Sequence, residues 1–189
     1  SVEYRRYRHN AQNRIRYVVE ERQNKAKEQY KCSIIDKNTV CKIVKEALDE
    51  KNIKGKILKI NPQESDYKKV TEDSSHIIFI QFTASGHIAV VGAGRDISFS
   101  KNESRGTWKI ISAIEGAEWD DKEVIVIPIQ NIKNYRIKKG ENILSYRNGV
   151  EQYLGDYLLS KEIPILNYFQ HKNYSDRFWE KCKKNGYII

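Results

Sequence analysis

His76-Ile-Ile-Phe-Ile-Gln-Phe-Thr83 is the strongest β-type run in the chain, and Ser85-Gly86 leads directly from it into His87-Ile-Ala-Val-Val91. Two runs rich in β-branched residues on either side of a short Ser-Gly turn predict a β-hairpin. Further strand-like runs occupy residues 56–60, 97–99, 107–111, 123–129 and 135–137. We therefore predict a central, mostly antiparallel sheet of five or six strands.

Helical patterns flank this β-rich middle. Apolar residues spaced by three or four predict a long first helix over residues 3–31 that docks weakly or projects. A second helix is predicted over residues 38–51, with Asp36 or Asn38 as its N-cap. Helices are also predicted near the C-terminus, over residues 146–161 and 174–184. The βαβ alternation of a parallel sheet is missing, so the order of elements predicts an α+β fold.

The division we expect is a basic N-terminal helix or arm over residues 1–35 and a single α+β domain over residues 36–189. The chain has 189 residues and a formal net charge of +9. No window approaches 18 apolar residues, so we expect no membrane span and no membrane partner.

The positive charge is concentrated at the two ends. Residues 1–31 carry nine basic and four acidic side chains, and residues 133–189 carry eleven basic and six acidic ones. Residues 32–132 have a net charge of −1. Charge asymmetry of this kind is typical of proteins whose ends contact a polyanion.

The N-terminal run is rich in arginine, and tyrosine alternates with it. Arginine binds phosphate in a bidentate manner, and both residue types stack on unpaired bases. This pattern favours nucleic acid as the partner, RNA more than DNA, although an acidic patch of another protein would also fit. The residues that we predict to bind nucleic acid are Arg5, Arg6, Arg8, Arg14, Arg16, Tyr7 and Tyr17.

The chain contains no Met and begins at Ser1. This fits a domain cut from a longer protein, which makes an upstream domain one candidate partner, or equally the removal of a tag. The three unevenly spaced cysteines do not form a disulfide pattern and favour a reducing compartment, the cytoplasm.

His87 is the candidate catalytic base because it opens a strand directly after the hairpin turn. Arg95 would stabilise negative charge on a phosphate, and Ser98 or Ser100 would position it. Together these residues predict a metal-independent ribonuclease in which the 2′-hydroxyl attacks the adjacent phosphate. A histidine that only caps the strand by hydrogen bonding is the alternative.

Cys41 supports a competing hypothesis, since the first turn of a helix lowers the pKa of a thiol. His87-Ile-Ala-Val-Val-Gly-Ala-Gly94 resembles the histidine strand of cell-wall peptidases of the NlpC/P60 type. This resemblance implies a papain-like cysteine hydrolase that uses Cys41 and His87. The sequence departs from that family around Cys41, which lacks an Asp-Cys-Ser or Asp-Cys-Gly context, and at Phe99, near where a third polar partner should fall.

No metal or cofactor is predicted. The sequence has no Cys-x-x-Cys or His-x-x-x-His pattern. Gly92-Ala93-Gly94 lacks the third glycine and the following helix of a dinucleotide site, so we expect a bulge or a tight turn there. The acidic residues of 115–123 predict an exposed loop.

Three functions therefore stay open. The first is a nucleic-acid-binding basic domain that cleaves RNA without a metal, in the manner of a toxin or effector. The second is the cysteine hydrolase. The third is a non-catalytic interaction module whose basic helix binds its partner.

Overall fold

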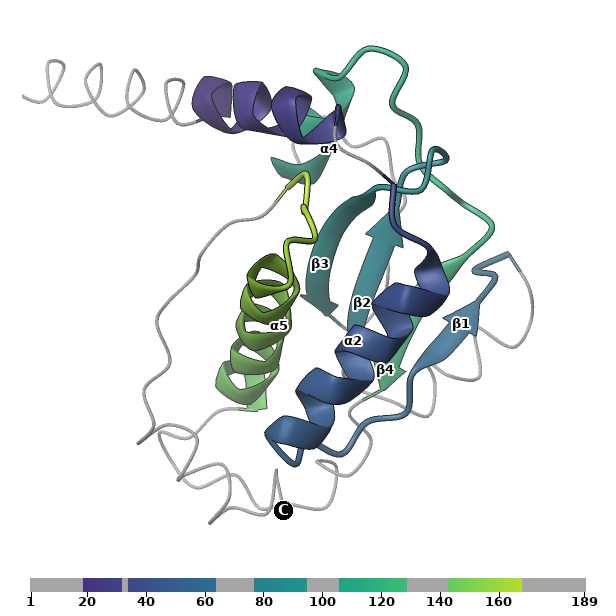
Figure 1. The fold of residues 1–189 in the computed structure, drawn as a ribbon, viewed down its shortest axis with the longest axis vertical. Coiled ribbons are helices and arrows are strands. Elements are labelled where there is room, and N and C mark those ends of the chain that lie inside the picture. The colour runs from purple at the N-terminus through teal and green to yellow at the C-terminus, as the bar shows by residue number, and fades with distance from the viewer. Residues whose placement is uncertain (1–18, 32–33, 64–76, 95–105, 129–142, 168–189) are drawn as a thin grey trace, which may run out of the picture.

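The fold is that of a computed structural model, which describes residues 19–31, 34–63, 77–94, 106–128 and 143–167 (Figure 1). Residues 19–30 are helical. The further elements are α2 (Lys37–Glu50), β1 (Leu58–Ile60), β2 (Ile77–Phe82), β3 (Ile88–Gly94), α4 (Gly106–Ser112), β4 (Val124–Pro128) and α5 (Ile143–Ser160). Four strands form a single antiparallel sheet, so the α+β class is confirmed.

The strand order is β1-β4-β2-β3. The predicted hairpin is present, with β2 and β3 paired in antiparallel register and Ile80 opposite Val91. Gly86 has a φ of +96° in the connecting turn, a conformation that favours glycine. The strand β4 inserts between β1 and β2, so it is an interior strand, and Pro128 stands at its last position opposite Ile77.

The prediction of five or six strands is not confirmed, since the sheet of the described residues has four. Thr107–Ile111, predicted as a strand, is part of α4. The isoleucines at 110, 111 and 114 lie on one helical face and are all buried, a pattern that a short apolar run does not separate from a strand. The predicted strands at 97–99 and 135–137 lie outside the described residues.

The helix predictions are tested only in part. The second predicted helix corresponds to α2, where the Asp36 side chain caps the start by accepting from the Thr39 amide at 3.3 Å. The first corresponds to residues 19–30 in its described part, and α5 covers the predicted helix over 146–161. Residues 1–18 and the last predicted helix lie outside the described residues, so a pair of full N-terminal helices stays a prediction.

Helices α2 and α5 cover one face of the sheet (Figure 1). They bury an apolar core against β2, β3 and β4 that includes Val44, Ile80, Phe82, Ile127 and Leu154. The Tyr153 hydroxyl of α5 donates to the Ala47 carbonyl of α2 at 2.7 Å, which ties the two helices together.

A second cluster joins helix 19–30 to α4 and to the chain after α5. Its buried members are Ala26, Ala89, Ile110, Ile111, Ile114 and Leu166. Ala89 alternates along β3 with Ile88, whose side chain belongs to the core under α2 and α5, so the two clusters lie on opposite faces of β3. Helix 19–30 is therefore attached at the end of the sheet where the hairpin turns.

Gly92-Ala93-Gly94 belongs to β3, so the expected bulge or tight turn is wrong. Gly92 pairs with Phe79 of β2, and the Phe79 ring covers it. A Cβ atom at position 92 would lie 2.4 Å from Cε2 and Cζ of that ring. The glycine is required by the close approach of an aromatic ring and not by a ligand.

Candidate functional site

His87 stands at the mouth of the β2–β3 hairpin, as predicted, but its side chain is only 7% exposed. Its Nδ1 lies 2.9 Å from the Ser85 Oγ, and that hydroxyl lies 2.8 Å from the Thr83 Oγ1. Thr83 Oγ1 also accepts from the His87 amide at 3.1 Å. The imidazole is thus held by a chain of hydroxyl groups that crosses the base of the turn.

The face of the imidazole packs on an aromatic ring. The Tyr30 ring, at the end of helix 19–30, lies with its centroid 4.5 Å from that of His87. This contact and the hydrogen bond to Ser85 explain how a polar ring is buried at low cost. Both interactions fit the structural alternative, a histidine that holds the hairpin and the N-terminal helix together.

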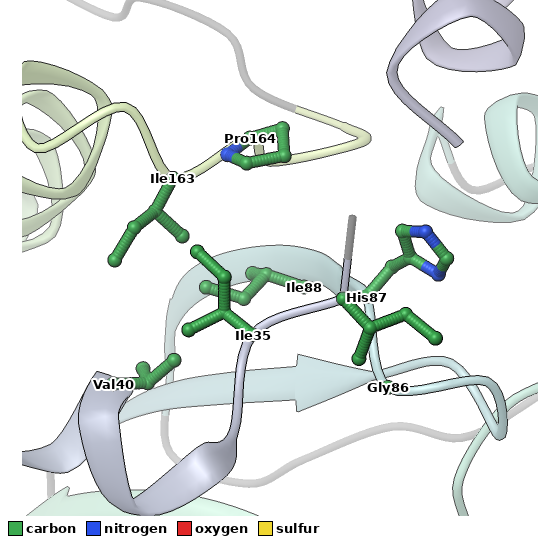
Figure 2. Close-up of a pocket in the computed structure, with 8 residues that line it drawn as sticks. Ile35, Val40, Gly86, His87, Ile88, Ile163 and Pro164 are labelled. Atoms are coloured by element: carbon green, nitrogen blue, oxygen red, sulfur yellow. The ribbon is translucent and has the colours of Figure 1, made fainter. Parts of the chain in front are cut away.

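A small cavity lies beside this residue, lined by Ile34, Ile35, Val40, Gly86, His87, Ile88, Ile163 and Pro164. Its volume is about 10 Å³, roughly the space that one water molecule needs. Figure 2 shows the imidazole turned away from the apolar side chains that line it. A nucleotide does not fit this cavity, and the ring does not point into it.

The strand β3 separates His87 from the segment that carries the other predicted catalytic residues. His87 directly precedes β3, which ends at Gly94, and at about 3.3 Å per residue the strand is about 20 Å long. Arg95, Ser98 and Ser100 lie outside the described residues. A catalytic site that joins them to His87 therefore stays a prediction.

Cys41 lies in the first turns of α2, as predicted, but the pKa of its thiol is raised. Partial burial raises the pKa of Cys41, and the charges of Glu123 and Asp36 raise it further against the opposing effect of Lys59. The direction is opposite to the lowering that we expected for this pKa, because burial and the two carboxylates outweigh Lys59. A role for Cys41 as a nucleophile stays a prediction. These charges belong to α2, β1 and the start of β4, whereas the contacts described for His87 come from Thr83, Ser85 and Tyr30.

Helix 19–30 is fixed to the domain by polar contacts that sequence reasoning missed. The Arg22 guanidinium donates to the Asn167 Oδ1, and the Asn167 Nδ2 donates to the Thr107 Oγ1 at 2.6 Å. Gln23 Nε2 donates to the Lys109 carbonyl at 2.9 Å. Each bond joins residues far apart in the sequence, so no local signal could have revealed them.

The residues predicted to bind nucleic acid, Arg5, Arg6, Tyr7, Arg8, Arg14, Arg16 and Tyr17, all lie outside the described residues. Val19 begins the described helix, and the side chains of Arg22, Gln23, Ala26 and Tyr30 hold that helix on the domain. The helix that directly follows the N-terminal basic segment in the sequence is therefore fixed on the domain.

The acidic loop before β4 is partly engaged and is not a free carboxylate cluster. Asp120 forms a 2.5 Å ion pair with Lys37 in the first turn of α2, and Glu123 lies 3.4 Å from the same ammonium group. Burial opposes ionisation of Asp120, but its hydrogen bonds to Lys37 and to the amides of Lys122 and Glu123 lower its pKa overall. The structure uses these carboxylates to fasten the start of α2.

The described residues contain no candidate metal site and no candidate membrane-spanning helix. No group of three or more His, Cys, Asp or Glu side chains in that part of the chain is arranged to hold a metal ion. None of the helices among the same residues combines the length and apolar character needed to cross a membrane. The comparisons with protein-family models, curated proteins and solved structures gave no match.

Proposed function

We propose that this chain is a basic α+β domain that binds nucleic acid, RNA in preference to DNA, through its N-terminal basic segment. The observation that carries the proposal is the attachment of helix 19–30. Ala26 is fully buried, Arg22 bonds to Asn167 and the Tyr30 ring packs on His87. A segment rich in arginine and tyrosine thus continues from a helix that the domain holds in place.

Electrostatics supply the affinity in this proposal. Residues 1–31 carry a net charge of +5, and arginine outnumbers lysine there by six to three. Lysine and arginine bind a polynucleotide largely by releasing its condensed counterions, and arginine and tyrosine also stack on unpaired bases. Stacking favours single strands over duplexes and needs no base-specific pocket.

Binding without catalysis is the form of the proposal that the site favours. The His87 ring is buried and hydrogen-bonded, and the pKa of the Cys41 thiol is raised. The ribonuclease and the cysteine hydrolase stay predictions from the sequence. Residence in a reducing compartment also stays a prediction.

The test is fluorescence anisotropy of labelled single-stranded RNA and DNA of about 20 nucleotides, a length that spans several phosphate contacts. Replacing Arg5 and Arg8 by Gln should weaken RNA binding by at least several-fold. The matched control replaces two exposed lysines of the domain, Lys122 and Lys161, by Gln and removes the same charge. Equal losses in both variants, or tight binding of an acidic protein but not of RNA, would contradict the proposal.

A further inference from the structure

The exposed surface of α2 has two edges of opposite charge. Along the edge next to α5, Glu46 and Glu50 face Tyr157, and partial burial and these carboxylates raise the pKa of that phenol. Along the other edge, Asn38, Lys42 and Lys45 follow at intervals of four and three residues and so form one stripe. The helix thus turns Glu46 and Glu50 toward α5, whereas Lys42 and Lys45, with Asp49 between them, lie on the other side.

A contact with β1 shows which way the lysine stripe faces. The Lys59 ammonium group of β1 donates to the Asn38 Oδ1 at the start of that stripe. Lys59 also acts on the Cys41 thiol, the neighbour of Lys42. Lys42, Lys45 and Lys59, which come from two separate elements, therefore share one side of the molecule, which we call the α2–β1 face.

The charges on this face are weakly compensated within the described residues. Lys42 is exposed and makes no ion pair there. Lys59 bonds to a neutral amide. Lys45 pairs with Asp49 at 3.3 Å, but their side chains are 72% and 68% exposed, so the pair is worth little and yields readily to another anion.

Apart from Asp49, three carboxylates near this face are engaged with other groups. Asp120 and Glu123 both pair with Lys37, which is 23% exposed at the beginning of α2. Asp36 caps the helix by accepting from the Thr39 amide. Charge counting along the sequence does not reveal this face, because residues 32–132 sum to −1 and only folding separates their acids from their lysines.

We propose that the α2–β1 face, formed by Lys42, Lys45 and Lys59, is a second contact surface for the phosphate backbone of a nucleic acid. The stripe from position 38 to position 45 extends about 10 Å along the helix, since each residue adds about 1.5 Å. Phosphates of one strand follow one another about every 3.4 Å along a duplex and further apart in an extended single strand, so about two or three phosphates pass along this length. The inference shares its ligand class with the proposed function but uses a different surface.

The experiment measures the slope of log affinity against log salt for the full chain and single-stranded RNA. Each phosphate contact contributes about 0.7 to that slope. Replacing Lys42 and Lys59 by Gln should lower it by about 1.4. The matched control replaces Lys109 and Lys161, which are also exposed, and should leave the slope within about 0.3 of the parent value.

A charge-conserving variant separates binding from folding. Replacing Lys42 and Lys59 by Arg should retain the parent slope, and all variants should unfold at the same temperature because the changed side chains are exposed. Equal slope changes in the Lys42/Lys59 and Lys109/Lys161 variants would overturn the inference, as would an unchanged slope in the former.

The variants with Arg5 and Arg8 replaced by Gln distinguish this inference from the proposed function. If replacement of Arg5 and Arg8 leaves RNA binding unchanged while replacement of Lys42 and Lys59 lowers the slope, the N-terminal site fails and the α2–β1 face stands. If instead replacement of Arg5 and Arg8 weakens RNA binding and replacement of Lys42 and Lys59 leaves the slope unchanged, the proposed role of the α2–β1 face is wrong and the N-terminal site stands. A parent chain without salt-dependent binding overturns both.

Discussion

Gly92→Ala should destabilise the fold, although alanine is ordinarily the better strand residue. The new Cβ atom would lie 2.4 Å from two atoms of the Phe79 ring and 3.2 Å from a third. Ordinary van der Waals contact begins near 3.4 Å, so the ring or the strand must move by about 1 Å. Phe79 is half-buried and packs against the buried residues Ile60, Ile77, Val124 and Val126, which limits its freedom to move.

The expected loss is about 1–3 kcal/mol, the usual cost of overpacking. For a chain of this size that loss lowers the melting temperature by about 2–12 °C. Urea unfolding followed by circular dichroism measures the free energy directly.

A second substitution isolates the cause. In a Phe79→Ala background the ring is absent, so Gly92→Ala should become neutral or stabilise by up to about 1 kcal/mol through the lower backbone entropy of the unfolded chain. The double-mutant cycle therefore predicts a coupling of about 1–4 kcal/mol. An equal loss in both backgrounds would refute the assignment of Gly92 to close packing under Phe79.

Three further outcomes follow from the site. Asp120→Asn should lower the free energy of unfolding by about 1 kcal/mol at pH 7. Because the folded-state pKa of Asp120 is lowered, the difference between variant and parent should vanish as the pH falls from about 4 through that pKa, which measurement of stability across acid pH would show. Because the pKa of Cys41 is raised, iodoacetamide at pH 8 should alkylate this thiol more slowly in the folded than in the unfolded chain. Mass spectrometry of the Cys41 peptide measures both rates, and equal rates would contradict burial of the thiol. His87→Phe should keep the ring contact with Tyr30 and retain RNA binding. Loss of the hydrogen bond to Ser85 should lower the free energy of unfolding in urea by about 1 kcal/mol. Loss of RNA binding by the folded variant would instead indicate a direct role for His87.

The predictable parts of the fold are those with local signals. The hairpin was predictable because two long apolar runs flank Ser85-Gly86, and α2 because Asp36 precedes a regular amphipathic pattern. The run Thr107–Ile111 was wrongly predicted as a strand because isoleucines at neighbouring positions are compatible with a strand and with a helix. The helix is favoured by packing against Ala89 and Leu166, which are distant in the sequence. The interior place of β4 depends on pairing with β1 and β2, which the sequence of one strand does not record.

The sequence allowed the position of the candidate site to be predicted, but not the burial and contacts of its side chains. The position of His87 at the hairpin mouth follows from the turn, but its burial depends on Tyr30, more than 50 residues earlier. Thr83, Ser85 and His87 alternate along the hairpin, and that spacing could have indicated their hydrogen bonds. The pKa of Cys41 is shifted in the direction opposite to the expected one because its place in the helix was visible in the sequence and its burial was not.

The central claim is that the chain binds nucleic acid mainly through phosphate contacts. The most direct measurement is the affinity of the unmodified chain for single-stranded RNA across a series of salt concentrations. Binding through about four to six phosphates predicts a slope of log affinity against log salt of about −3 to −4. A slope near zero, or no binding at low salt, would contradict the claim.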